Sequence, residues 1–388
     1  MNASEDAYAR AGVSQSDADL SVSRLVGALA GINLGKPSRQ IDLKGHYAAV
    51  MKLDDTNGIA LSTDGVGTKL LIAEELGRFD TVGIDCIAMN VNDIICVGAE
   101  PIAMLDYLAV EKADPDQCEQ IGIGLARGAE LSGIEIPGGE LAQIGDLVKG
   151  FDIAGACFGT IRLDSVIDGS AVAPGDVVIG LPSSGLHSNG YTLARKALEG
   201  IPMDDLRLNR PLGEILIEPT EIYVKAIMDL LKSSADVHGL AHITSGGLDN
   251  LLRLKSEVTY EITDPLHPQP IFNLIAERAG VPEDEMYEVF NMGCGFCVVV
   301  PEASAEAALE SLNHFYDSAR RLGHVSEGPA QVIRGSGFRC QRRVCRHMSR
   351  IPCAIPVMSH FSRTTSRNSR RRRRRVGSLF MSFRRLDR

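Results

Sequence analysis

The sequence predicts a mixed α/β fold that is divided into two domains. With 388 residues, the chain is long enough for each domain to bury a hydrophobic core of its own. Its hydrophobic fraction of 44% and its 39 glycines are typical of globular α/β proteins. Strand-like and helix-like segments also alternate along the chain, and glycine-rich turns separate them.

The first domain is expected to cover residues 1–164. Its elements are a strand–turn–helix unit, a helix, a β-rich segment, a second helix and a final strand, at residues 58–78, 81–98, 101–110, 114–133 and 151–163. Several glycine-rich turns come where a strand leads into a helix. Phosphates bind at such junctions, because free helix N–H groups and the helix dipole favour anions.

The second domain is expected to cover residues 165–333. A proline–glycine turn and a buried strand open it within residues 170–185. Helices are predicted at residues 189–199, 219–234, 243–254 and 303–321, and strand-like segments at 290–300 and 323–334. Both halves therefore combine strands with helices.

The formal net charge of −10 combines two regions of opposite sign. Residues 1–333 carry a charge of −26, which disfavours nucleic acid as a partner. Residues 334–388 contain 17 arginines, no lysine and one acidic residue, which gives +16. We expect this basic tail to be disordered, because it cannot bury enough apolar surface. Its abrupt change of composition resembles translation in a wrong reading frame.

Composition also indicates a cytoplasmic enzyme. The acidic N-terminus lacks the layout of a signal peptide, and no stretch approaches the roughly 20 apolar residues of a membrane helix. The odd number of cysteines, nine, favours reduced thiols. Cys294 and Cys297 have CxxC spacing, but they lie in the apolar run 290–300. We therefore interpret them as buried strand cysteines rather than as a metal or redox pair.

The most informative segment is Ser-Thr-Asp-Gly-Val-Gly-Thr-Lys at residues 62–69. Asp64 ends a predicted strand, so its carboxylate should project from the edge of the sheet. Gly65 and Gly67 allow the backbone to approach a ligand, and Lys69 adds a positive charge. This combination favours phosphate with a divalent metal, although the spacing is not that of a Walker A loop. The alternative is a capped turn between a strand and a helix.

Further carboxylates are candidates for the same site. Asp93 lies in an apolar helical segment, where an ionised side chain is costly unless a metal or hydrogen bonds compensate it. Asp85 lies on nearly the same helix face and is either a cap or a partner. Glu140 follows the pair Gly138-Gly139 at an expected turn. For Glu140, contact with metal or ATP and a plain surface turn both remain open.

Two more loops offer groups that bind ligands. Residues 183–190 follow a predicted strand and supply hydroxyls, backbone donors, the Asn189 amide and the His187 imidazole. His187 is a candidate acid, base or phosphoryl ligand, and the alternative is a structural or exposed histidine. The segment Thr-Ser-Gly-Gly at residues 244–247 precedes a predicted helix and is typical of an anion-binding turn.

Together these segments resemble the aminoimidazole ribonucleotide synthetases over almost all of residues 1–333. The similar motifs occur in the order typical of that family, and HSNGY with EPTEIYVK distinguishes it from others of the same fold. The matching motifs are YARAGV at 8–13, STDGVGTK at 62–69, DTVGIDCIAMNVNDIICVGAEP at 80–101, GGE at 138–140, FDIAG at 151–155, SSGLHSNGYTLARK at 183–196, IEPTEIYVK at 217–225, HITSGG at 242–247 and EMYEVFNMGCGF at 285–296.

The resemblance implies a two-domain α/β protein whose N-terminal sheets pair in a homodimer. It also implies that the protein uses ATP and Mg²⁺ to convert formylglycinamidine ribonucleotide into aminoimidazole ribonucleotide. ATP would phosphorylate the formyl oxygen, and the amidine nitrogen would then attack the formyl carbon and release phosphate.

The same resemblance assigns roles to residues at matching positions. Asp64 and Asp93 would hold magnesium. The expected ATP-binding residues are Asp64, Gly65, Gly67, Thr68, Lys69, Asp93 and Glu140. The expected substrate-binding residues are Ser184, His187, Ser188, Asn189, Thr244, Gly246 and Gly247, with His187 and Asn189 at the formyl and amidine end and the last three at the phosphate. The expected catalytic residues are Asp64, Lys69, Asp93, His187 and Asn189.

The chain departs from the family pattern at several points. Ser245 stands where the family commonly has a glycine, so it must tolerate the local backbone. The first lysine is Lys36, so a lysine that many members place near ATP is absent or displaced. The resemblance also stops at about residue 334.

Two kinds of alternative function remain. Selenophosphate synthetases carry a reactive cysteine or selenocysteine near the N-terminus, whereas the first cysteine here is Cys86. Thiamine-monophosphate kinases and hydrogenase carbamoyl-dehydration proteins lack HSNGY with EPTEIYVK. A nucleic-acid-binding protein would use the arginine run at 370–375, but the tail has few stacking aromatics and no recognisable module.

Overall fold

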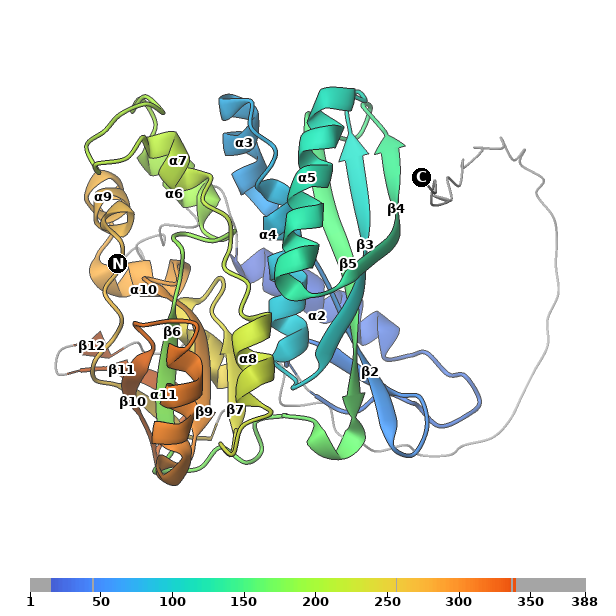
Figure 1. Ribbon diagram of the computed structural model, residues 1–388, viewed down its shortest axis with the longest axis vertical. Coiled ribbons are helices and arrows are strands. Elements are labelled where there is room, and N and C mark those ends of the chain that lie inside the picture. Colours follow the sequence, from blue (N-terminus) through green and yellow to red (C-terminus); the bar gives the residue numbers. More distant parts are fainter. Residues whose placement is uncertain (1–14, 44, 256, 336–337, 340–388) are drawn as a thin grey trace, which may run out of the picture.

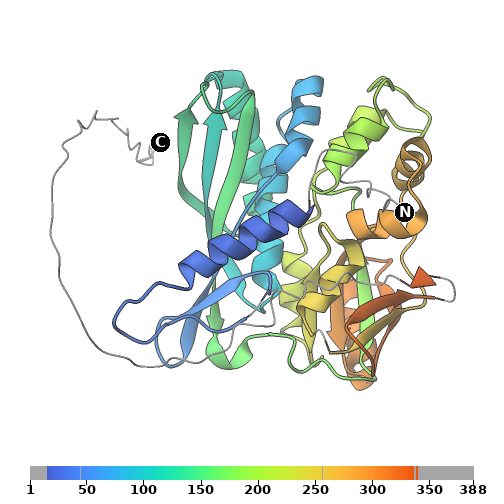
Figure 2. The ribbon, with the colours of Figure 1, turned by 180° about the vertical axis from the view of Figure 1, so that it is seen from behind.

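The computed structural model describes residues 15–43, 45–255, 257–335 and 338–339. It forms two lobes, each built on one sheet, and the helix α4 (Val82–Ile95) lies where they meet (Figure 1). Seen from behind in Figure 2, helix α2 (Gln15–Leu29) crosses beside the first sheet. Among the residues that the structure describes, no helix is long and apolar enough to span a bilayer.

The first sheet has five strands in the order β1-β2-β5-β3-β4. They are β1 (Ala49–Lys52), β2 (Asn57–Gly65), β3 (Glu100–Val110), β4 (Glu135–Gln143) and β5 (Phe151–Arg162). Neighbours run antiparallel except for the parallel pair β3 and β4. Helices α4 and α5 (Pro115–Ser132) lie on one side of this sheet (Figure 1). Residues of β5 alternate between buried and less buried positions, so one face of the sheet forms the core.

The second sheet has seven strands in the order β12-β11-β8-β10-β6-β9-β7. They are β6 (Val177–Pro182), β7 (Gly239–His242), β8 (Thr259–Ile262), β9 (Cys294–Val300), β10 (Arg320–Ser326), β11 (Gln331–Arg334) and β12 (Phe338–Arg339). Central strands β6 and β9 are buried almost throughout, as continuous apolar runs predict.

Short helices surround these sheets. They are α3 (Leu70–Leu76), α6 (Tyr191–Ala197), α7 (Leu212–Leu216), α8 (Val224–Leu230), α9 (Pro270–Ala279), α10 (Glu283–Val289) and α11 (Ala305–Asn313), with the 3-10 turns η1 (Gly67–Lys69), η2 (Leu163–Ser165), η3 (Gly247–Arg253) and η4 (Glu302–Ser304). Strand β7 and helix α8 pack against α4 of the first lobe. The two lobes therefore meet along α4.

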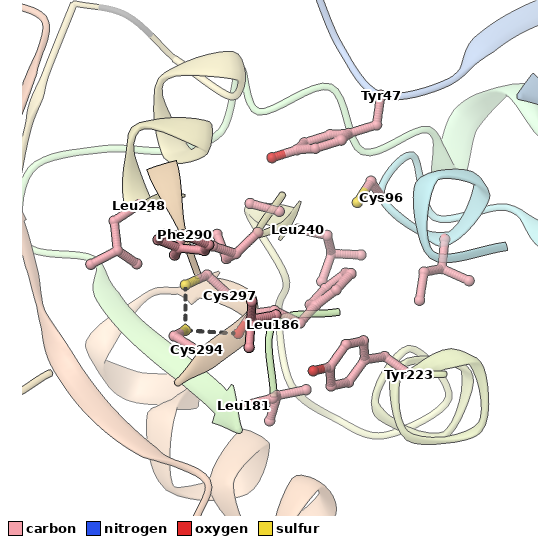
Figure 3. Close-up of a cluster of buried hydrophobic side chains, with 14 of the residues drawn as sticks. Tyr47, Cys96, Leu181, Leu186, Tyr223, Leu240, Leu248, Phe290, Cys294 and Cys297 are labelled. Carbon is pink, nitrogen blue, oxygen red and sulfur yellow. Dashed lines mark hydrogen bonds between the residues drawn. The ribbon is translucent and has the colours of Figure 1, made fainter. Parts of the chain in front are cut away.

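The predicted cysteine environment is confirmed. Cys294 and Cys297 are buried on β9, and their Sγ atoms lie 3.6 Å apart at hydrogen-bond distance. Figure 3 shows them in an apolar cluster with Leu181 and Leu186, while Tyr47 and Cys96 of the first lobe approach the same region. The pair is therefore part of the core.

The structure corrects several predicted elements. Residues 138–140 form no turn but lie inside β4, which pairs in parallel with β3. A Cβ on Gly139 would lie 2.2 Å from a carboxylate oxygen of Asp106, so a larger residue there would displace the Asp106 side chain. The predicted helix over 303–321 ends earlier, since α11 stops at Asn313 and β10 begins at Arg320.

Strands β11 and β12 reach past residue 333, where the second domain was expected to end. Arg334 ends β11, where its guanidinium stacks 3.9 Å above the Tyr287 ring and binds Asp284. Strand β12 then pairs with β11. These residues belong to the second sheet because they complete its edge. The prediction of disorder for residues 340–388 falls outside the described residues.

The crossing of α4 and α5 generates a stability prediction. A Cβ on Gly83 would lie 2.3 Å from the backbone nitrogen of Leu125, so Gly83→Ala should push the helices apart. We expect a loss of about 1–3 kcal/mol in the free energy of unfolding, measured in urea. Gly122→Ala on the exposed face of α5 meets no atom within 4 Å and should stabilise by up to about 1 kcal/mol. Equal effects of the two substitutions would contradict this account of the crossing.

Candidate active site

Helix α4 supplies polar side chains at the boundary between the lobes. The Asn90 side chain accepts from the Asp64 N–H at 3.0 Å and donates to the Asp64 carbonyl at 3.0 Å. These bonds fix the end of β2 against α4. Gly155 makes room for the amide, because a Cβ there would lie 2.9 Å from Asn90 Nδ2. Hydrogen bonds to its backbone therefore fix the position of Asp64, and its carboxylate is not used in this contact with Asn90.

The structure brings Asp64 and Asp93 into electrostatic contact. Burial raises the pKa of Asp64, and the neighbouring carboxylate of Asp93 raises it further. The Gly65 N–H donates to Asp64 at 2.7 Å and partly offsets this rise in pKa. Asp93 also lies 2.9 Å from Nδ1 of His242, the last residue of β7. Asp64 and Asp93 therefore lie close enough for their charges to interact.

Lys69 is buried at the boundary between the lobes. Its side chain has no exposed surface, and its Nζ pairs with Asp85 at 2.8 Å and donates to the Glu218 carbonyl at 2.5 Å. The expected contact with ATP phosphates needs an open ammonium, whereas this one is enclosed by protein groups. The geometry gives Lys69 a positioning role and identifies Asp85 as its partner.

Asp85 gathers donors from the second lobe. One of its oxygens accepts from the Thr220 N–H and hydroxyl, both at 2.7 Å, and from the Ser188 hydroxyl at 3.2 Å. Thr220 belongs to the IEPTEIYVK motif, and Ser188 to the loop at 183–190. This one carboxylate therefore ties both segments to α4.

His187 occupies a strained and enclosed position in the loop. Its φ of 62° is uncommon for a residue with a side chain. Its Nε2 accepts from the Ser184 N–H at 3.2 Å, so the ring proton lies on Nδ1. Burial lowers the pKa of His187 well below 6.5, with smaller effects from His242 and Lys69. Nδ1 is buried and has no hydrogen-bond partner among the described groups, which leaves one donor for a ligand.

The loop at 244–247 meets the loop at 183–190. The Ser245 hydroxyl donates to Asn189 Oδ1 at 2.9 Å. Gly246 and Gly247 have φ of 91° and 53°, whereas Ser245 is not among the residues with positive φ. Ser245 therefore replaces a glycine without backbone strain. The structure thus brings together the two loops that the sequence assigns to the substrate.

The remaining predicted residues are spread around this boundary. Thr68 lies 3.2 Å, oxygen to oxygen, from Thr192 of α6, so it also reaches the second lobe. Gly67 has a φ of 72° with open space beside it, as a ligand-binding turn requires. Ser184 donates to the Pro219 carbonyl at 2.6 Å, which attaches its loop to the segment before α8.

Glu140 is not gathered with the other carboxylates. It pairs with Tyr107 at the edge of the sheet and is exposed. Asp64 lies on β2, three strands away in the order β2-β5-β3-β4. Gly139 pairs with Asp106 and faces the same side of the sheet. Successive residues of a strand face opposite sides, so Glu140 faces the side away from Asp106.

Sequence reasoning missed two residues. Asp106 stands in register with Gly155, which in turn stands opposite Asp64, so both carboxylates share the α4 face about 10 Å apart. Burial raises the pKa of Asp106. His242 begins the HITSGG motif, but nothing local indicated that it would contact Asp93. The only local signal for Asp106 was a carboxylate in an apolar strand.

Comparison with known proteins identifies relatives over both lobes. Residues 45–161 match the N-terminal domain, and residues 173–335 the C-terminal domain, of the AIR synthase related protein family. A phosphoribosylformylglycinamidine cyclo-ligase of Methanobrevibacter smithii is 52% identical over 73% of this chain and 84% of its own. The protein of that name in Pyrococcus furiosus is 48% identical over 86% of this chain and 98% of its own.

Solved structures show the same fold. A HypE–HypF complex has a TM-score of 0.57 and 21% identity, covering 76% of this chain and 92% of that chain. AaThiL complexed with AMPPCP and TMP has a TM-score of 0.56 and 20% identity, covering 76% of this chain and 88% of that chain.

The buried ion pair generates a second stability prediction. Lys69→Met removes the cation and leaves Asp85 buried, so the free energy of unfolding should fall by about 3–5 kcal/mol. The double variant Lys69→Met with Asp85→Asn should regain part of this loss, because no net charge then stays buried. Arg78→Met is the control, since its pair with Glu214 is 36% and 48% exposed and should contribute below about 1 kcal/mol. Chemical denaturation would measure all three, and a loss at Lys69 as small as at Arg78 would refute the buried pair.

Proposed function

This chain belongs to the AIR synthase related family, and we propose that it is an ATP-dependent cyclo-ligase in purine biosynthesis, working in the cytoplasm. Its substrate is formylglycinamidine ribonucleotide, and its products are aminoimidazole ribonucleotide, ADP and phosphate. The observation that carries this proposal is the identity of 45–52% to proteins named phosphoribosylformylglycinamidine cyclo-ligase. The hydrogen bond between Asp93 and His242, which lies just before the loop at 244–247, supports it.

The reaction makes a poor leaving group into a good one. The formyl oxygen takes the terminal phosphoryl group of ATP, the amidine nitrogen attacks the formyl carbon, and the C–O bond breaks to release phosphate. Such a transfer depends mainly on positioning and on neutralising the charge of the moving phosphoryl group. A site between two lobes is suited to this task, because each lobe holds one substrate.

The carboxylates fit Mg²⁺ that is shared with ATP. Mg²⁺ is usually held by one or two carboxylates together with substrate phosphates and water. Asp64 and Asp93 supply such a pair. Burial, and to a smaller extent the Asp93 charge, raises the pKa of Asp64, and a cation bound there would favour its ionised form. No dedicated cage of three ligands exists among the described residues. When bound, Mg²⁺ supplies charge that neutralises the phosphates.

His187 and Asn189 act at the reacting end of the substrate. The Nδ1–H of His187 is a free buried donor, suited to a formyl or phosphoryl oxygen. Asn189 is oriented by Ser245, so the formyl and phosphate ends of the substrate are held by connected loops. Thr244, Gly246 and Gly247 take the phosphate, and Gly65, Gly67 and Thr68 line ATP.

The exposed face of the first sheet supports a homodimer. Leu61, Leu105 and Tyr107 lie on the face away from α4 and are 37%, 47% and 46% exposed. Partly buried Phe158 of β5 belongs to the same face. Large apolar side chains gathered on one exposed face are costly to leave in water. A second copy that presents the same face is the partner that satisfies it with two-fold symmetry.

The activity experiment tests the function. Purified protein with Mg²⁺ should release one ADP for each imidazole ring closed. Asp64→Asn and Asp93→Asn should each lower kcat about 10²-fold or more, because each removes charge opposite the phosphates. Glu130→Gln on α5, a carboxylate 69% exposed, is the control and should keep full activity. Release of ADP with selenide or thiamine monophosphate, and not with this substrate, would refute the assignment.

The dimer has its own test. Leu105→Glu combined with Tyr107→Glu should convert the dimer to monomer in sedimentation equilibrium, since charge on a buried apolar face is strongly unfavourable. Leu147→Glu is the matched control, because Leu147 is 83% exposed and outside the sheet. A wild-type chain that sediments as a monomer would rule out the proposed face as a dimer interface.

A further inference from the structure

The contact between His242 and Asp93 joins the two lobes at the proposed metal site. His242 ends β7 of the second lobe and its side chain is completely buried. Asp93 belongs to α4 of the first lobe, and its side chain is 16% exposed. The 2.9 Å separation between Nδ1 and Oδ1 is a hydrogen bond. The Asp93 carboxylate is therefore partly exposed at the site and is hydrogen-bonded to His242 of the second lobe.

The neighbouring Asn92 fixes which nitrogen of His242 carries the proton. The Asn92 amide group donates to the Glu221 carbonyl at 2.8 Å, and its oxygen accepts from the Tyr223 N–H at 3.0 Å. The orientation of the amide is thus determined, and its Nδ2 faces His242 Nε2 at 3.5 Å. A nitrogen facing a donor must accept, so the proton lies on Nδ1 and is donated to Asp93.

The chain beyond His242 leads directly into the substrate loop. Ile243 is held by its N–H to the Gly295 carbonyl at 3.0 Å, and the loop at 244–247 follows. Gly295 also lies beside His187, since a Cβ there would meet the imidazole at 2.5 Å. A shift of the substrate loop therefore acts on His242 through a single intervening residue.

We infer that His242 is a positioning residue that holds the Asp93 carboxylate in place for magnesium-bound ATP and connects this carboxylate to the substrate loop. The inference rests on the proposed function, in which Asp93 is a metal ligand. Groups that orient a ligating carboxylate typically change metal affinity or activity by about 10–100-fold when they are removed. His242 has no contact with the reacting atoms in this arrangement, so its effect passes through Asp93.

Two amide variants separate positioning from general packing. In His242→Asn the amide nitrogen can occupy the place of Nδ1 and still donate to Asp93. In His242→Gln the longer side chain directs its amide toward Asn92 instead. Both replace a buried imidazole by a polar amide. His238→Asn is the matched control, because His238 lies just before β7 and its Nδ1 binds Asp176 at 2.8 Å, away from α4.

The readouts are the Kd of Mg·ATP by calorimetry, kcat, and the thermal midpoint of the ligand-free protein. His242→Gln should weaken Mg·ATP binding about 10–100-fold, with His242→Asn much closer to wild type. The control His238→Asn should bind as wild type does. Saturating substrate should tighten Mg·ATP binding in wild type and should lose this effect in His242→Gln.

Equal Mg·ATP affinity in His242→Gln, His242→Asn and wild type would overturn the inference, even if the thermal midpoints fell. An equal loss in both amide variants that tracks the thermal midpoint would also overturn it and show a packing role only. Failure of the proposed function gives a different result: wild type would bind Mg·ATP and close no ring. Asp93→Asn would serve as the reference for complete loss of the carboxylate.

Discussion

Lys69 and Asp85 place opposite charges in a fully buried position between the two lobes, and the second lobe supplies further hydrogen bonds to one oxygen of Asp85. Removing two ions from water costs several kcal/mol for each, and their attraction offsets this cost only with close geometry and further hydrogen bonds. Asp85 obtains those bonds from Ser188 and Thr220. Both residues belong to the second lobe, so the charges are stable only when the lobes are in contact. The ion pair therefore helps to fix the relative position of the two candidate binding regions.

Other buried polar side chains of helix α4 also bind neighbouring segments. Its apolar residues make the core of the first lobe, while Asn90 holds the end of β2 and Asn92 holds the segment before α8. A buried amide that lacks partners is costly, so each one selects a single arrangement of its neighbours. Asp93, the next residue, is consequently presented to the site at a fixed place. Because the site is already ordered, little of the binding free energy of a ligand is lost in ordering its side chains.

Glycines allow these polar groups to approach. Gly295 leaves the space that Tyr223 and His187 occupy, since its Cβ would lie 1.9 Å from the tyrosine oxygen. Tyr223 then donates to the Pro182 carbonyl, just before the loop at 183–190. Tyr223 of the second lobe therefore supports the loop at 183–190, and Asp85 of the first lobe binds the same loop through Ser188.

The sequence by itself determined the mixed α/β class, the buried strand of Cys294 and Cys297, and the segments that carry Asp64, Asp93 and His187. Apolar periodicity and glycine placement are local, and a local pattern reports burial and turns. It predicted a turn at Glu140, where the structure has a strand, and it gave no sign that Lys69 is buried. The partners of Lys69, Asp93 and Glu140 come from distant segments or neighbouring strands. Only packing of the lobes and the register of the sheet bring such groups together, because buried polar groups must find partners wherever the fold supplies them.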